Sequence, residues 1–257
     1  MPDSLTISGG ALCAFLLVLA RVAGALSFVP LPGIKGIPEP ARAALAVALT
    51  LALFPRWPAV DAGAVTAAGL AGWALAEATV GLAIGVSMSF VLEAFTVAAQ
   101  IAGLQAGYAY ASTVDPNTEA DSGVLLVFAQ LMASALFFAL GLDREVLRLF
   151  ARSLDAIPLG AYGMSRASAK PIVELSAGLF TVGMRLALPV VALLVMVDVA
   201  LALLGRLNQQ LQLLSLAFPA KMLIALLALS WLAVLYPRIM TEFGGQACAA
   251  ARRILGL

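Results

Sequence analysis

Six apolar segments, separated by shorter polar connections, dominate the pattern along this chain. They cover residues 11–29, 41–55, 70–104, 124–142, 172–204 and 217–236. The third and fifth segments stand out because each continues well beyond thirty residues. As helices rising ~1.5 Å per residue they would be about 50 Å long, whereas the hydrocarbon layer of a bilayer is ~30 Å thick. We expect these two helices to break, to tilt steeply, or to stand partly outside lipid against other protein.

The composition and this pattern together predict the fold class. Hydrophobic residues make up 63% of the chain and charged residues 11%, whereas soluble domains contain about 25% charged residues. The apolar runs are unbroken, while a transmembrane β-barrel alternates apolar and polar residues. A helix satisfies its own backbone hydrogen bonds in lipid. We therefore predict an all-α, polytopic integral membrane protein with about six hydrophobic helices, some overlong or kinked, and a C-terminal helical hairpin.

The ends of the chain bear on its orientation. The first apolar segment has an acidic residue, Asp3, before it and no cation before Arg21, so we interpret it as a retained span rather than a signal peptide. With six crossings, most Lys and Arg residues fall on the side of the two termini, which predicts that both termini are cytoplasmic. Segment 41–55 is short for a span and is expected at the interface or buried in protein.

Two parts of the chain differ in organisation. Residues 1–160 hold four segments with long, irregular connections. Residues 161–257 hold a predicted hairpin and a tail, and Pro189 is expected to kink the first arm of the hairpin. Between the two parts, residues 143–159 alternate apolar positions with arginines, which predicts an amphipathic helix. That helix either lies at the membrane interface or docks a partner, and the pattern leaves both interpretations open.

A stripe of small and acidic residues recurs every four positions in the third segment: Glu77, Gly81, Gly85, Ser89 and Glu93. Positions four apart share one face of a helix, and glycine and serine allow another backbone to approach closely. We interpret Gly81, Gly85 and Ser89 as a helix-packing interface. A proton path through the two glutamates is the alternative.

The charges inside apolar segments include five that stand out: Arg21, Glu77, Glu93, Arg185 and Asp198. Each costs a few kcal/mol at bilayer depth unless it is paired or hydrated. They are therefore expected to face protein or a water-filled cavity. The spacing assigns no pairs among them, so buried structural pairing and a transport site both stay open.

The connection over residues 103–123 is long, carries no Lys or Arg, and contains the turn signal Asp115-Pro116-Asn117. Loops of this length without secondary structure are uncommon and are often functional. The residues alone leave two interpretations, a segment that gates or lines a channel and an ordinary exposed loop.

Several classes of function find no support in the residues. The chain contains no histidine, and its two cysteines, Cys13 and Cys248, are far apart in sequence. There is no phosphate-binding loop, no nucleophile elbow and no zinc-binding motif. The net charge of +1 gives no case for nucleic acid. We predict a protein that is not an enzyme and has no cofactor or metal.

A resemblance to a known family rests on several short stretches. Residues 103–107, 111–112 and 114–116 carry it, and three other stretches keep the same order and spacing. Those are residues 38–42, 156–160 and the pair 203–206 with 217–221. Together they resemble the flagellar biosynthesis protein FliR family from about residue 11 to 240. One departure is the turn at residues 209–212, which lacks a proline common in the family.

The resemblance implies a subunit of the inner-membrane export gate of the flagellar type III secretion apparatus, at the flagellar basal body. Residues 1–160 would be FliP-like and residues 161–257 FliQ-like. One copy would join FliP-like and FliQ-like subunits in a helical ring, with FlhB-like and FlhA-like export components as further partners. Unfolded flagellar proteins would pass through the pore, and the ATPase and the proton-motive machinery would be separate.

The resemblance also gives the connection a role, because the matching loop of the family plugs the channel. The plug, at about residues 105–123, would include Tyr108, Tyr110, Ser112, Asp115, Pro116, Asn117, Glu119 and Asp121. Two alternatives remain. One is a gate subunit of a virulence type III system. The other is a self-contained ion-coupled secondary transporter whose site would use Glu77, Glu93, Arg185 and Asp198.

Overall fold

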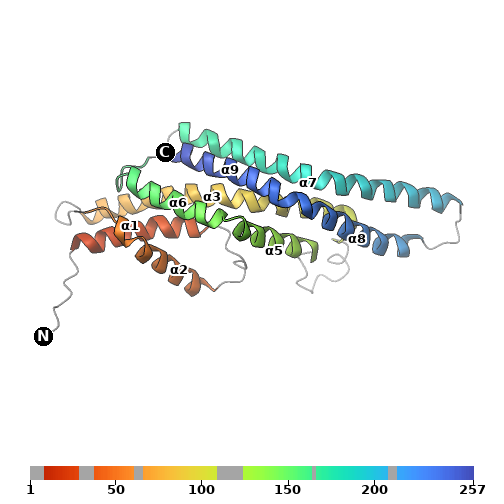
Figure 1. The fold of residues 1–257 in the computed structure, drawn as a ribbon, viewed down its shortest axis with the longest axis horizontal. Coiled ribbons are helices and arrows are strands. Elements are labelled where there is room, and N and C mark those ends of the chain that lie inside the picture. Colours follow the sequence, from red (N-terminus) through yellow and green to blue (C-terminus); the bar gives the residue numbers. More distant parts are fainter. Residues whose placement is uncertain (1–8, 29–37, 61–65, 109–123, 164–165, 208–212) are drawn as a thin grey trace. The chain divides into compact units, whose positions relative to one another are not determined.

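The structure is a computed structural model that describes residues 9–28, 38–60, 66–108, 124–163, 166–207 and 213–257 (Figure 1). Every regular element in these ranges is a helix, so the predicted all-α class is confirmed. The α-helices are α1 (Gly9–Leu26), α2 (Glu39–Ala52), α3 (Ala67–Ala106), α5 (Val124–Ala139), α6 (Leu142–Ala156), α7 (Arg166–Leu207), α8 (Leu213–Leu232) and α9 (Tyr236–Leu255). Two short 3-10 turns are η2 (Phe54–Arg56) and η4 (Ala233–Leu235).

Four stretches of helix are long and apolar enough to cross a membrane, and the bent pair of α5 and α6 would make a fifth. They are α1, α3, residues 168–206 of α7, and residues 217–255 across α8 and α9. The protein is therefore a polytopic membrane protein, as predicted. Six crossings exceed this count in the described ranges, because α2 has 14 residues and a span needs ~20.

The two overlong segments form single helices. α3 has 40 residues and α7 has 42, which corresponds to about 60 Å for each at ~1.5 Å per residue. α7 stays helical through Pro189, the position of the expected kink. Their surroundings differ, since 67% of the apolar window of α3 is buried in the protein and only 22% of that of α7. α3 is therefore the more enclosed of the two long helices.

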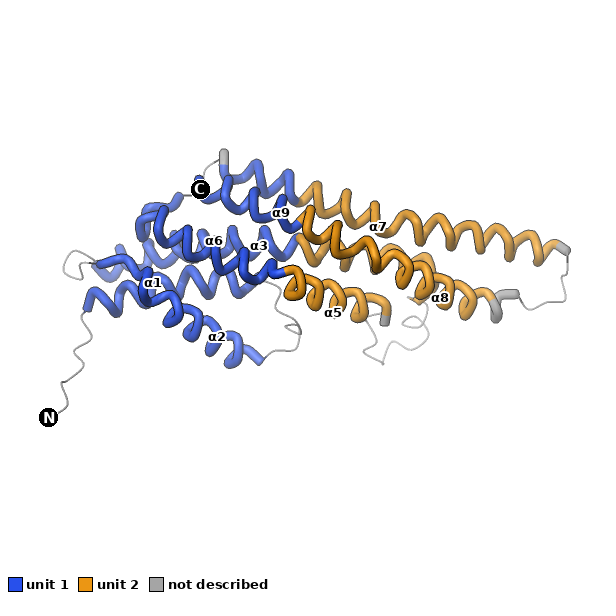
Figure 2. Tube along the Cα trace, viewed as in Figure 1, with its two compact units in different colours: residues 1–90, 141–175, 244–257 blue, residues 91–140, 176–243 orange. Residues whose placement is uncertain are grey.

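One compact unit contains residues 1–90, 141–175 and 244–257 (Figure 2). Its core holds Leu17 and Val22 of α1, Ile84 of α3 and Leu149 of α6, all fully or nearly fully buried. The amphipathic helix expected over residues 143–159 is α6, and it turns its apolar positions into this core. Its arginines stay on the exposed side.

The other compact unit contains residues 91–140 and 176–243 (Figure 2). Here the second half of α3 buries Phe95 and Ala102, and the hairpin of α7 and α8 contributes Leu194 and Ala225. The Phe95 ring meets the Tyr236 ring edge to face, with the ring centroids 5.4 Å apart. α9, which begins at Tyr236, is an element that the sequence did not predict.

These units are defined by compactness and differ from the predicted division into residues 1–160 and 161–257. The predicted division describes likeness to two other gate subunits. It stays a prediction, because compactness does not test ancestry.

Candidate functional site

A buried ion pair joins α1 to α3. The Arg21 Nε donates to Glu77 Oε2 at 2.5 Å, and neither side chain has any exposed surface. The guanidinium also donates to Ser153 Oγ at 3.1 Å and to the Ile157 carbonyl at 3.5 Å. The second Glu77 oxygen accepts the backbone N–H of Gly160 at 3.0 Å. Because both charges are paired and hydrogen-bonded, burial is tolerated.

This network accounts for two of the five charges in the apolar segments. Arg21 and Glu77 are 56 residues apart, so spacing within one helix could not pair them. Ser153 was missed as a member. The signal was a serine on the buried face of an amphipathic helix, where a hydroxyl needs a polar neighbour.

The two glycines of the stripe in α3 lie against α1 of the same chain. A Cβ added at Gly81 would stand 1.9 Å from the Arg21 carbonyl oxygen, and one at Gly85 would stand 2.5 Å from that of Ala25. Ser89 is half-buried and donates to the Val86 carbonyl of its own helix at 2.9 Å. The glycines therefore let two helix backbones meet where a side chain would not fit.

Glu93 and Arg185 behave differently. Both side chains are exposed, and neither takes part in an ion pair among the described residues. Both lie inside helices that satisfy the criteria for a membrane span. Exposed charges on such helices need a partner or water.

The fifth charge, Asp198, is the centre of a cluster in the second unit. Its carboxylate accepts from Lys221 Nζ of α8 at 2.9 Å and 3.0 Å, one contact to each oxygen. It also accepts from Gln105 Nε2 of α3 at 3.1 Å. Lys221 was not predicted as a site residue, and Gln105 entered the prediction only as the first residue of the plug range 105–123. Both lie in stretches that carry the family resemblance.

The end of α3 lies beside this cluster. Gly107 has φ +87°, the left-handed conformation that suits glycine. The Tyr108 N–H donates to the Gly103 carbonyl at 3.0 Å and the Gly107 N–H to that of Leu104 at 3.2 Å, which is the pattern of a Schellman C-cap. The Tyr108 hydroxyl then donates to the Met222 carbonyl of α8 at 3.3 Å.

The predicted plug range begins inside the described part of the chain, since residues 105 and 106 are the end of α3. Of the individually named plug residues, Tyr108 is described. Tyr110, Ser112, Asp115, Pro116, Asn117, Glu119 and Asp121 lie outside the described residues. Burial raises the pKa of the Tyr108 phenol, which keeps it protonated and able to donate.

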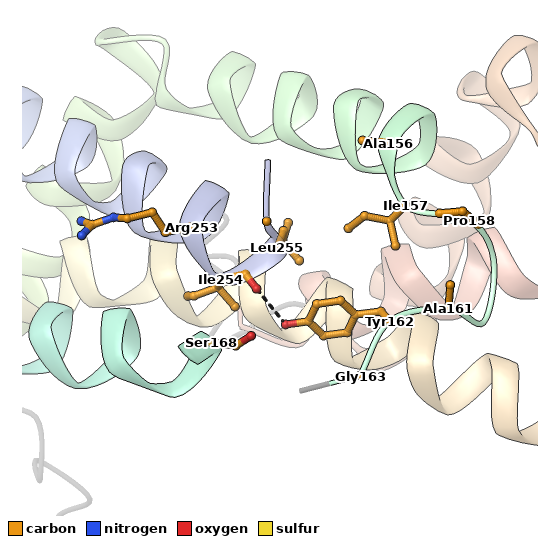
Figure 3. A pocket seen from close by; sticks show the side chains of 11 residues that line it. Ala156, Ile157, Pro158, Ala161, Tyr162, Gly163, Ser168, Arg253, Ile254 and Leu255 are labelled. Atoms are coloured by element: carbon orange, nitrogen blue, oxygen red, sulfur yellow. Dashed lines mark hydrogen bonds between the residues drawn. The ribbon is translucent and has the colours of Figure 1, made fainter. Parts of the chain in front are cut away.

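A cavity of about 430 Å³ lies in the first unit, between the chain after α6 and the end of α9 (Figure 3). The Tyr162 hydroxyl donates to the Ile254 carbonyl across it at 3.1 Å. Arg253 extends away from the cavity and pairs with Glu174 at 3.5 Å. Small and apolar side chains form most of the lining. Within the described ranges no cluster of His, Cys, Asp or Glu could hold a metal ion.

Long apolar helices, a buried ion pair and exposed charges on the spans define the class of a polytopic membrane protein. The chain belongs to the bacterial export proteins, family 1, because the model of that family matches residues 12–246. The resemblance drawn from the sequence is thereby confirmed.

Curated relatives agree with this family. The chain is 28% identical over 222 residues to the flagellar biosynthetic protein FliR of Escherichia coli (strain K12), covering 86% of this chain and 83% of that protein. It is 27% identical to the protein of the same name from Bacillus subtilis (strain 168), with 84% of each chain covered. For the protein of that name from Caulobacter vibrioides, identity is 27% and coverage is 83% and 86%.

Proposed function

We propose that this protein is a subunit of the inner-membrane export gate of the flagellar type III secretion apparatus. It forms part of the channel for unfolded export substrates and closes that channel at rest. The family match and the names of the relatives support the flagellar apparatus. They favour it over a virulence secretion system.

The observation that carries the proposal is the exposed apolar face of α7. Exposed apolar side chains occur along most of the helix, and they are Val173, Phe180, Met184, Leu188, Leu193, Val195, Met196, Val199, Leu203 and Leu204. From the first to the last, this face extends about 45 Å at ~1.5 Å per residue. The hydrocarbon layer covers ~30 Å. The remainder requires cover by protein, as in a subunit that is surrounded by partners.

Arg185 strengthens this argument because it is exposed on the same helix, between Met184 and Leu188. If lipid surrounds it, the unpaired charge costs a few kcal/mol. If lipid stops short of it, the apolar residues on one side of it lie outside the membrane. Either position calls for cover other than lipid, which a partner helix would supply. FliP-like and FliQ-like subunits supply such helices in the proposed gate, and FlhB-like and FlhA-like components are its further partners.

The plug is the finer part of the proposal. Residues 105–123 would block leakage of small solutes at rest and move aside during export. The family resemblance supports this role, and so does the described start of the segment, where Tyr108 is held on α8.

Isolation of the complex through a tag on this chain tests the proposal. The chain is co-expressed with FliP-like and FliQ-like proteins, and the mass of the purified particle is measured. We expect a complex of fixed composition, and poor recovery of the chain when it is expressed alone. A lone chain that is monodisperse and catalyses solute uptake in liposomes would instead establish the secondary transporter.

The transporter alternative has less support. Its site would need Glu77, but that carboxylate is fully buried and already bound by Arg21 and the Gly160 N–H. A carboxylate occupied in this way offers no open site for an ion.

A further inference from the structure

We propose that Asp198 is a positioning residue of the gate: it holds the last turn of α3 on the hairpin of α7 and α8, and so sets where the chain leaves α3. The inference rests on the proposed function in one respect, since Tyr108 and the chain that follows it belong to the predicted plug. The contacts themselves lie within one compact unit.

The first line of support is the number of helices that meet at one carboxylate. Asp198 is on α7, Lys221 is on α8 and Gln105 is in the last turn of α3. Lys221 reaches both carboxylate oxygens, and Gln105 donates to one of them. Hydrogen bonds that involve a charged group are stronger than neutral ones. Groups from three helices therefore meet at this one carboxylate.

A second set of contacts lies next to the first and points the same way. A Cβ added at Gly107 would stand 2.8 Å from Phe218 Cδ1 of α8, so the backbone of the α3 terminus packs directly on that ring. The Tyr108 hydroxyl reaches the Met222 carbonyl, one residue after Lys221. Four consecutive residues at the end of α3 thus supply three contacts to the hairpin.

Loss of the Asp198 carboxylate would destabilise the protein at Lys221, because the Lys221 side chain is poorly solvated. The Lys221 side chain is only 14% exposed, whereas that of Asp198 is 42% exposed. Without the carboxylate, the ammonium group would lose its acceptor in a place with little water. The end of α3 would separate from the hairpin so that water could reach Lys221.

That separation is expected to stay local. Earlier turns of α3 in the same unit are held by Phe95, Ala99 and Ala102, which are almost fully buried. Loss of one polar contact at the terminus leaves this apolar packing in place. Asp198 therefore affects the position of the terminus more than the assembly of the fold.

The test uses the assembled gate carrying Asp198→Asn, studied by amide hydrogen exchange and by ion conductance at rest. We expect exchange at the Gly107 and Tyr108 amides to rise about tenfold, as loss of one charge-assisted hydrogen bond implies. Resting conductance should rise several-fold with an unchanged yield of complex. The matched control is Asp155→Asn, which removes an exposed carboxylate paired with Arg56 and should change neither measurement.

A charge swap keeps the inference falsifiable if Asp198→Asn prevents assembly. The double variant Asp198→Lys with Lys221→Asp restores the ion pair and should return exchange and conductance close to the original values. If the double variant exchanges as fast as a variant with Lys221→Met, the ion pair does not hold the terminus and the inference is overturned.

Deletion of residues 109–121 separates this inference from the proposed function. If the deletion leaves conductance unchanged, the assignment of the plug is rejected. Amide exchange at Gly107 and Tyr108 then still tests whether Asp198 holds the end of α3. If the deletion raises conductance while Asp198→Asn changes neither exchange nor conductance, the role of Asp198 is wrong and the plug stands. Where the deletion does raise conductance, faster exchange in Asp198→Asn without added conductance also overturns a role of Asp198 in the gate.

Discussion

Arg21 in α1 and Glu77 in α3 form an ion pair at 2.5 Å with no exposed surface on either side chain. The ion pair links α1 to α3. Its other hydrogen bonds reach Ser153 and the chain after α6, so one network joins three distant parts of the sequence.

Glu77→Gln is predicted to destabilise the protein by about 3–5 kcal/mol, because it leaves the Arg21 charge buried without its counter-charge. Thermal dissociation of the purified complex measures the effect. The control is Asp155→Asn, which breaks an ion pair whose side chains are about half exposed and should cost about 0–1 kcal/mol. Equal losses in the two variants would contradict a special role for the buried pair.

Gly81→Ala is predicted to reduce the yield of folded complex, because the new Cβ would stand 1.9 Å from the Arg21 carbonyl oxygen. Overpacking of this kind typically costs about 1–3 kcal/mol, and Gly81→Leu should block assembly. Gly72→Ala is the matched control on the same helix, since nothing lies within 4 Å of its Cβ position. Yields are compared by quantitative purification, and normal yield of Gly81→Leu would reject the close contact with α1.

Gly107→Ala is predicted to destabilise the end of α3 for two reasons. A residue with a Cβ at φ +87° pays roughly 1–2 kcal/mol, and the Cβ would also meet Phe218 at 2.8 Å. Gly256→Ala isolates the first cost, because its φ is +72° and its Cβ position is open. If both variants lose the same stability in thermal unfolding, the contact with Phe218 contributes nothing.

Arg185→Glu is predicted to lower co-purification of partner subunits several-fold, because a partner helix that pairs with the arginine would meet a like charge. Arg185→Lys should retain most of the association. Arg144→Glu is the control, since Arg144 is an exposed arginine on the polar side of a different helix, α6. Pull-down through a tag on this chain gives the ratio, and unchanged recovery with Arg185→Glu would place the partner elsewhere.

Deletion of residues 109–121 in the assembled gate is predicted to raise ion leak at rest. A blocked pore loses its seal when the chain that fills it is removed. A variant that replaces the same residues by Gly and Ser of equal length tests whether bulk alone is enough. Conductance of the gate in planar bilayers measures both, and an unchanged value after the deletion would mean that the seal lies elsewhere.

The sequence by itself determined where the helices are. All six apolar segments contain a helix of the structure, and the alternation at residues 143–159 is α6. This succeeds because an apolar run in lipid has to satisfy its backbone within the segment. α9 was missed because its Gly, Ala and charged residues make a weak hydropathy signal, and packing of Met240 and Phe243 decides that it is helical.

Only the tertiary structure decided which residues meet. The sequence indicated that Gly81 and Gly85 admit a close backbone, but the identity of that backbone, α1, depends on the packing of two helices far apart in the chain. The same holds for Arg21 with Glu77 and for Asp198 with Lys221 and Gln105. Helix formation is a local matter of hydropathy, whereas pairing depends on helix rotation and offset, which short-range patterns do not encode.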